Sequence, residues 1–163
     1  MKKTFLLLFI LFFSISKTHA CRCIRSDKSL NKKVKKAFKQ ADLILSGKVI
    51  AMNVVNEKDL RFSSDLIRYT FEIKKTIKGK IKREIIEISS SASSASCAYL
   101  FELGRSYLVY AKKWPQVSSK TKNTANYFTS LCDRNQQLKN VHRKELIKLK
   151  KLSRRKIKHL NDN

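Results

Sequence analysis

The spacing of apolar residues divides the chain into segments of different character, and the first is a short apolar run. Residues Phe5–Phe13 are all apolar, two lysines precede them and a polar stretch follows. This order is typical of a secretory signal peptide. The run is shorter than the roughly 20 residues that a transmembrane helix needs. Thr18-His19-Ala20 matches the small-x-small pattern that precedes a signal-peptide cleavage site. We therefore expect residues 1–20 to be removed and the mature chain to begin at Cys21.

The predicted signal peptide determines where the mature protein is expected and how Cys21 is processed. The mature protein is expected to be secreted, or to be periplasmic if the source is a Gram-negative bacterium. Lipoprotein processing, which would attach lipid to Cys21, is the less favoured alternative. Such signals usually have Leu, Val or Ile at the position where this chain has Thr18.

A helical pattern follows the predicted cleavage site. Between residues 26 and 41 apolar residues recur every three or four positions, and lysines fill the opposite face. This spacing predicts an amphipathic helix that begins near Asp27 or Ser29. The apolar positions are Leu30, Val34, Ala37, Phe38 and Ala41.

The pattern between residues 43 and 131 is typical of strands. The first apolar stretch is long and contains Gly47, which predicts a bent strand. Alternation and turn residues, including Lys78-Gly79-Lys80, predict four more. The five expected strands cover residues 43–55, 67–74, 83–88, 107–111 and 127–131. Few strands, one of them bent, favour a small closed barrel over a seven-stranded sandwich. The predicted fold class is therefore mainly β, with a helix at each end.

Two further segments complete the pattern. Residues Ser89–Ser96 contain only Ser and Ala, so we expect an exposed loop that ends at Cys97. Residues 139–160 carry an apolar stripe among ten basic residues and one acid, Glu145, which predicts a basic amphipathic helix. We favour a helix that caps the barrel over a dedicated binding helix. The expected divisions are a signal peptide (1–20), a barrel domain (21–138) and a basic helical tail (139–163).

The charge balance indicates a basic protein. Three of the 37 basic residues lie in the predicted signal peptide, so the mature chain has 34 basic and 12 acidic residues, a net charge of +22. Such a charge favours polyanions as partners, here an acidic polysaccharide, an anionic surface or extracellular DNA, while export argues against intracellular nucleic acid. Insertion of the tail into a membrane is disfavoured because the tail has no Trp or Phe. The candidate polyanion patch is Lys148, Lys150, Lys151, Arg154, Arg155, Lys156 and Lys158.

The four cysteines are Cys21, Cys23, Cys97 and Cys132. An even number in an exported chain favours two disulfides, which an oxidising compartment permits. Three connectivities are possible, although a Cys21–Cys23 bridge would be strained. A zinc site is the less favoured alternative, because Cys-x-Cys differs from the usual Cys-x-x-Cys spacing and the compartment disfavours thiolates.

Catalytic chemistry has little support in the sequence. The mature chain has two histidines, His142 and His159, without the His-Glu-x-x-His spacing of zinc proteases. The cysteines are assigned to disulfides, and the glycines are too scattered for a phosphate-binding loop. We therefore expect no catalytic residues, no cofactor and no metal of its own.

Several motifs, in order and spacing, are similar to the inhibitory domain of the tissue inhibitors of metalloproteinases (TIMPs). The resemblance covers roughly residues 21–133, and its most specific element is the Cys-x-Cys start. It implies a netrin-like module, which is a five-stranded OB-fold barrel. The matching motifs are Cys21-Arg22-Cys23, Ala37–Leu43, Ile67-Arg68-Tyr69 with Lys78-Gly79, Ser94–Cys97 and Leu131-Cys132-Asp133.

The resemblance also implies a mechanism. The disulfides would join Cys21 to Cys97 and Cys23 to Cys132, and the Cys21 α-amine and carbonyl would chelate the catalytic zinc of a metalloendopeptidase. The protein itself would act as a monomer. The segment entering the protease pocket would be Arg22, Cys23 and Ile24, and a second contact ridge would be Ala95, Ser96 and Cys97.

The sequence departs from the animal TIMPs at three points. Arg22 replaces a small Ser or Thr, and a guanidinium in an apolar pocket costs several kcal/mol unless an acid meets it. Lys39 replaces a cysteine of a third disulfide, and no cysteine follows Cys132, so no cysteine-rich second domain is expected. The alternative function is therefore a non-inhibitory basic netrin-like module that binds extracellular polyanions.

Overall fold

A computed structural model describes residues 21, 23, 28–55, 66–114 and 127–161. The predicted signal peptide lies outside these residues, as do Arg22 and Ile24 of the segment expected to enter the protease pocket. Among the described helices, none is both long enough and apolar enough to span a membrane.

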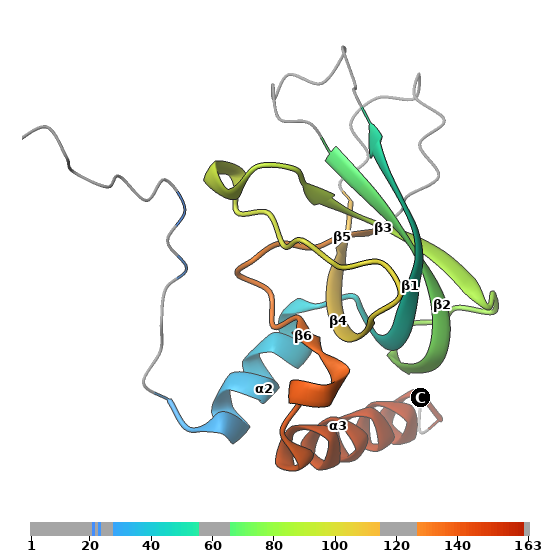
Figure 1. Ribbon diagram of the computed structural model, residues 1–163. Coiled ribbons are helices and arrows are strands. Elements are labelled where there is room, and N and C mark those ends of the chain that lie inside the picture. The colour runs from blue at the N-terminus through green and yellow to red at the C-terminus, as the bar shows by residue number, and fades with distance from the viewer. Residues whose placement is uncertain (1–20, 22, 24–27, 56–65, 115–126, 162–163) are drawn as a thin grey trace, which may run out of the picture.

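Five strands close into a barrel, as the sequence predicted (Figure 1). The hydrogen-bonding order is β1-β2-β3-β5-β4, and β4 pairs back to β1. All these pairs are antiparallel except β3–β5. A short sixth strand, β6 (Gln136–Gln137), pairs with β4 outside the ring. The barrel strands are β1 (Leu43–Val55), β2 (Leu66–Lys78), β3 (Ile85–Ser91), β4 (Ser106–Lys113) and β5 (Tyr127–Phe128).

Closure depends on the bend in β1, which the sequence indicated at Gly47. The β1–β2 register shifts between Ser46 and Gly47 and at two other points along the pair. A Cβ atom at Gly47 would lie 2.7 Å from the backbone oxygen of Glu72, so a side chain there would force the two strands apart. The bend lets one strand pair with β2 along its length and with β4 over residues 43–48.

The barrel interior is built around Phe101. Its ring makes edge-to-face contacts with Tyr69, Phe71 and Tyr107 at centroid distances of 4.9, 5.1 and 4.9 Å. Such geometry adds to the free energy of apolar burial. Aliphatic side chains from three strands, β1, β3 and β4, complete this core: Leu43, Leu45, Val49, Ile88 and Val109.

Two helices cover one end of the barrel (Figure 1). The N-terminal helix α2 (Leu30–Gln40) and the C-terminal helix α3 (Arg143–Asn161) share a second apolar cluster with β1 and β4. Leu149 of α3 is 1% exposed within it. The basic C-terminal helix therefore packs on the barrel, although it begins at Arg143, after a 3₁₀ turn at Leu138–Asn140. The cluster comprises Val34, Phe38, Ala41, Ile44, Leu108, Tyr110 and Leu149.

Two local expectations were wrong. The first part of the serine-rich segment is not an exposed loop. It forms the end of β3, and its residues Ser89, Ser90 and Ser91 are buried. Small hydroxyl side chains fit this crowded position, and the Ser90 Oγ accepts a hydrogen bond from the Tyr99 N–H at 2.9 Å. The last barrel strand is also shorter than expected, since β5 ends at Phe128 and the chain then turns away.

Candidate functional site

Two disulfides fix the described N-terminal cysteines to distant loops. Cys21 is bonded to Cys97 and Cys23 to Cys132, which is the pairing that the resemblance implied. The Cα atoms are 5.3 and 5.2 Å apart, respectively. The sulfur atoms of Cys21, Cys23 and Cys132 lie within 4.8 Å of one another, so the two bridges are adjacent. Because all four cysteines are bonded, this cluster has no thiolate for a metal ion.

The loop that carries Cys97 is held by its own hydrogen bonds. A single 3₁₀ turn spans Ser94–Ser96, and the Ser93 carbonyl accepts N–H bonds from Ser96 and Ala98 at 3.0 and 3.2 Å. Cys97 has a φ of 58°, a conformation that costs a non-glycine residue roughly 1–2 kcal/mol. The disulfide and these bonds fix this strained residue, while Ala95 and Ser96 remain exposed.

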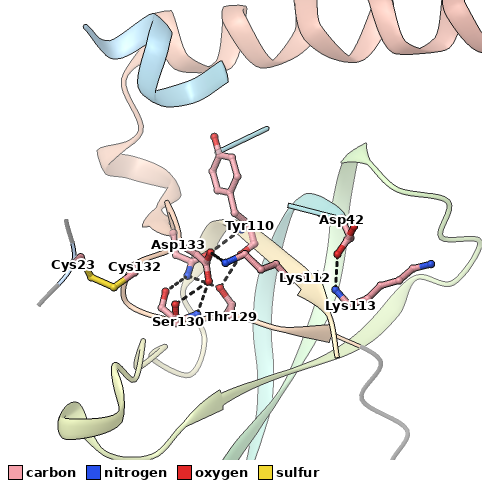
Figure 2. Close-up of polar contacts among 10 residues, drawn as sticks. Cys23, Asp42, Tyr110, Lys112, Lys113, Thr129, Ser130, Cys132 and Asp133 are labelled. Carbon is pink, nitrogen blue, oxygen red and sulfur yellow. Dashed lines mark hydrogen bonds and ion pairs between the residues drawn. A yellow bond between two sulfur atoms is a disulfide. The ribbon is translucent and has the colours of Figure 1, made fainter. Parts of the chain in front are cut away.

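The loop of residues 129–135 carries Cys132 and is anchored to the barrel (Figure 2). The Thr129 Oγ1 donates to the Tyr110 carbonyl at 2.7 Å, and the Asn135 side chain donates to the Thr129 Oγ1 at the same distance. In return, the Tyr110 N–H donates to the Asn135 Oδ1 at 2.9 Å. Thr129 and Asn135 are both buried, so these bonds form in a low-dielectric setting where breaking them is costly.

Asp133, the neighbour of Cys132, closes the same loop (Figure 2). Its Oδ2 accepts hydrogen bonds from the N–H and the Oγ of Ser130, both at 2.9 Å. Its Oδ1 forms an ion pair with Lys112 Nζ of β4 at 2.8 Å. The Leu131 N–H donates to the Cys97 carbonyl at 2.8 Å, so the two cysteine loops are also bonded directly to each other.

A buried carboxylate ties this loop to the C-terminal helix. Glu145 of α3 accepts hydrogen bonds from Arg134 Nε and Nη2 at 2.8 and 2.6 Å, and from the Tyr110 hydroxyl at 2.8 Å. Gln136 Nε2 donates to it at 3.2 Å. The Glu145 side chain is 1% exposed, so its charge depends on these partners. Glu145, the single acid among residues 139–160 of the predicted basic helix, therefore has a structural function.

The network also shifts two pKa values. The hydrogen bond to Glu145 raises the pKa of Arg134 above its ordinary value, against the opposing effect of burial. Burial raises the pKa of Tyr110, and the negative charge of Glu145 raises it further. Tyr110 is therefore a neutral hydrogen-bond donor, and Arg134 keeps its positive charge.

The model of the tissue inhibitor of metalloproteinase family matches residues 19–156. The chain belongs to that family. No curated protein matches it. TIMP family members are extracellular inhibitors that bind metalloproteinases and are not enzymes. The match covers the barrel and runs into α3, whose first turn carries Glu145.

The structure brings some of the residues selected from the sequence together. The disulfides bring Cys21 and Cys23 together with the loop of Ala95, Ser96 and Cys97. Sequence reasoning missed the buried network behind Cys132. The only sequence feature that indicated this network was Glu145, a single acid near the start of a strongly basic helix. That feature did not indicate which residues Glu145 contacts.

The candidate polyanion patch lies on α3. Lys148 is partly buried, and Lys150, Lys151, Arg154 and Arg155 are exposed. The side chains of Lys156 and Lys158 lie outside the described part of the structure.

Replacement of Glu145 by Gln tests the role of this carboxylate. Glu145→Gln leaves the Arg134 charge without its partner, and we expect the free energy of unfolding to fall by about 3 kcal/mol, as for other broken buried pairs. Urea denaturation followed by circular dichroism measures this change. Hydrogen exchange should also become faster in residues 129–137.

The matched control is Glu102→Gln, which breaks the exposed Arg105–Glu102 pair. Because exposed pairs contribute little, its expected loss is below about 1 kcal/mol. Equal losses in the two variants would contradict the role assigned to Glu145.

Proposed function

We propose that this protein is a secreted inhibitor of a zinc metalloendopeptidase and that it chelates the protease zinc through the α-amine and carbonyl oxygen of Cys21. The observation that carries the proposal is that two disulfides fix Cys21 and Cys23 to the barrel domain. Cys21 and Cys23 are each bonded to a loop that has its own hydrogen-bond network. Membership of an inhibitor family supports the same conclusion.

The chemistry of an α-amine suits this task. Its pKa is about 7.7–8.0, so an appreciable fraction is neutral near pH 7 and has a lone pair for a metal. The carbonyl oxygen of the same residue can close a chelate ring with that nitrogen. Catalytic zinc keeps one coordination position for water, and a ligand in that position displaces the water that attacks peptide bonds.

The free amine exists only after the predicted signal peptide is removed. Export and inhibition are therefore linked in the proposal: cleavage before Cys21 creates the zinc ligand, and the oxidising compartment permits the disulfides. A residual peptide or an attached lipid at Cys21 would leave no chelating amine.

Rigidity contributes to affinity. A flexible peptide loses conformational entropy when it is ordered at a binding site, and a cross-linked segment has lost most of it already. We assign the pocket-entering segment to Arg22, Cys23 and Ile24, and the second contact ridge to Ala95, Ser96 and Cys97. Ala95 and Ser96 are exposed and beside the Cys21–Cys97 bridge, which supports this assignment.

Arg22 narrows the class of target. Because side chains alternate in direction along an extended segment, our proposal assigns the position between the two bonded cysteines to the protease contact. A guanidinium entering a protease pocket needs an acidic partner there, because an apolar pocket would leave the charge desolvated and unpaired. The proposed target is therefore a metalloendopeptidase with an acidic group in the pocket beside its zinc.

An N-terminal extension tests the chelate. One Ala added before Cys21 converts the amine into an amide nitrogen with no available lone pair and inserts a peptide plane into the zinc site. We expect the inhibition constant against a sensitive zinc endopeptidase to rise by at least about a thousandfold, or roughly 4 kcal/mol. Circular dichroism and non-reducing peptide mapping should show an unchanged fold and unchanged disulfides.

Equal inhibition by the native and extended proteins would rule out the chelating mechanism. Failure of the native protein against a broad panel of zinc endopeptidases would instead favour the alternative of a non-inhibitory polyanion-binding module.

Replacement of Arg22 by Thr tests the specificity assignment. Arg22→Thr removes the charge that an apolar pocket would desolvate but leaves the chelate intact. We expect inhibition to improve by tenfold or more for proteases with apolar pockets and to weaken for the native target. The same protease panel measures both changes, and Lys28→Thr, an equal loss of charge at an exposed site, is the control. An unchanged order of inhibition across the panel would contradict a pocket contact by Arg22.

A further inference from the structure

A cleft lies between the start of α2 and the middle of α3. Its volume is about 470 Å³, which falls within the range of small-molecule sites. Three lysines of α3 line one wall: Lys144, Lys148 and Lys151. The apolar side chains of Leu30 and Ile147 also face the cleft. Figure 1 shows the two helices together at one end of the barrel.

The helices around this cleft carry a large excess of positive charge. Helix α2 has five lysines and no acid. Residues 143–155 of α3 have seven basic residues and one acid, Glu145, whose carboxylate is buried against Arg134. Within the described part of the chain, no lysine of either helix forms an ion pair with an acidic side chain. Among the described residues, the positive charge at the cleft is therefore not neutralised by an acidic side chain.

We propose that this cleft is a binding site for an anionic polysaccharide, a sugar chain that carries sulfate or carboxylate groups. The three lysines are spaced at i, i+4 and i+7, which places them along one face of the helix over roughly 10 Å. A linear chain with regularly spaced anions can contact all three. The exposed Ile147 and the adjacent Leu30 provide an apolar surface for the C–H faces of sugar rings.

Two other polyanions fit the surface less well. Single-stranded nucleic acid binds through aromatic side chains on which bases stack, and the only Phe, Tyr or Trp in the two helices is Phe38, which is buried. A membrane-binding helix needs an apolar face for the bilayer, but α3 already packs Leu149 and Leu152 into the second apolar cluster, between the helices and the barrel. The chemistry at the cleft therefore favours a ligand with anions but without bases or acyl chains.

The test uses a fluorescently labelled heparin decasaccharide as probe. Binding is measured by anisotropy at several salt concentrations for the native protein and for the triple variant Lys144→Gln, Lys148→Gln and Lys151→Gln. Gln removes the charge and has a helix propensity close to that of Lys, and circular dichroism verifies the fold. We expect the variant to bind at least tenfold more weakly at 0.15 M salt. The slope of log affinity against log salt should fall by about one for each lost contact.

A second triple variant controls for net charge. Lys48→Gln, Lys74→Gln and Lys82→Gln remove three exposed lysines from the barrel instead of the helices, with the same change in total charge. We expect this control to change the affinity by less than threefold. Equal weakening by the two triple variants would show that only the overall charge matters, and it would overturn the proposed site.

Two more outcomes would overturn the proposal. One is a lack of binding by the native protein at 0.15 M salt. The other is tighter binding to single-stranded DNA or to vesicles containing phosphatidylserine, with the same dependence on the cleft lysines. The assay contains no protease, and the cleft variant should retain whatever inhibition the native protein shows. The polysaccharide site can thus fail or succeed independently of the inhibitory mechanism.

Discussion

The two disulfides can hold Cys21 and Cys23 in place only if the loops that carry Cys97 and Cys132 are themselves rigid. Both loops meet this constraint through backbone and side-chain hydrogen bonds, and the Leu131 N–H joins one loop to the other. The 129–135 loop is further fastened to β4 through Thr129 and to α3 through the Arg134–Glu145 pair. The order at the N-terminus thus depends on contacts far along the chain.

Net charge makes the same cross-links important for stability. A chain with a net charge of +25 repels itself when it folds, and its core is divided between a barrel interior and a cluster under two helices. The disulfides join residues 76 and 109 positions apart. Loops of this size reduce the entropy of the unfolded chain by an amount worth about 4–5 kcal/mol per bridge in the chain-entropy model. Exposed lysines on the two helices, such as Lys36 of α2 and Lys151 of α3, can then be accommodated at the surface.

Features set by local pattern could be predicted from the sequence, and features set by tertiary contacts could not. The alternation of apolar and polar residues predicted β2, and Gly47 predicted the bend in β1. Apolar residues at helical spacing predicted both helices. The burial of Ser90 depends on neighbours that no local pattern reveals, so a run of small residues was mistaken for a loop. Likewise, an acid on a strongly charged helix, as Glu145 is, would be expected to face solvent. Its partners Arg134 and Tyr110 come from separate segments, so the local pattern does not reveal its burial. The cleft at Lys144 requires two helices that are distant in sequence.

In the proposed function, Cys21, which is bonded to Cys97, is the ligand for a protease's zinc. A crystal structure of the mature protein in complex with a zinc endopeptidase that it inhibits tests this most directly. We expect the Cys21 nitrogen and carbonyl oxygen both to lie about 2.0–2.2 Å from the zinc, in place of the catalytic water. A complex in which the zinc keeps its water and the protease contacts another face of the barrel would contradict it.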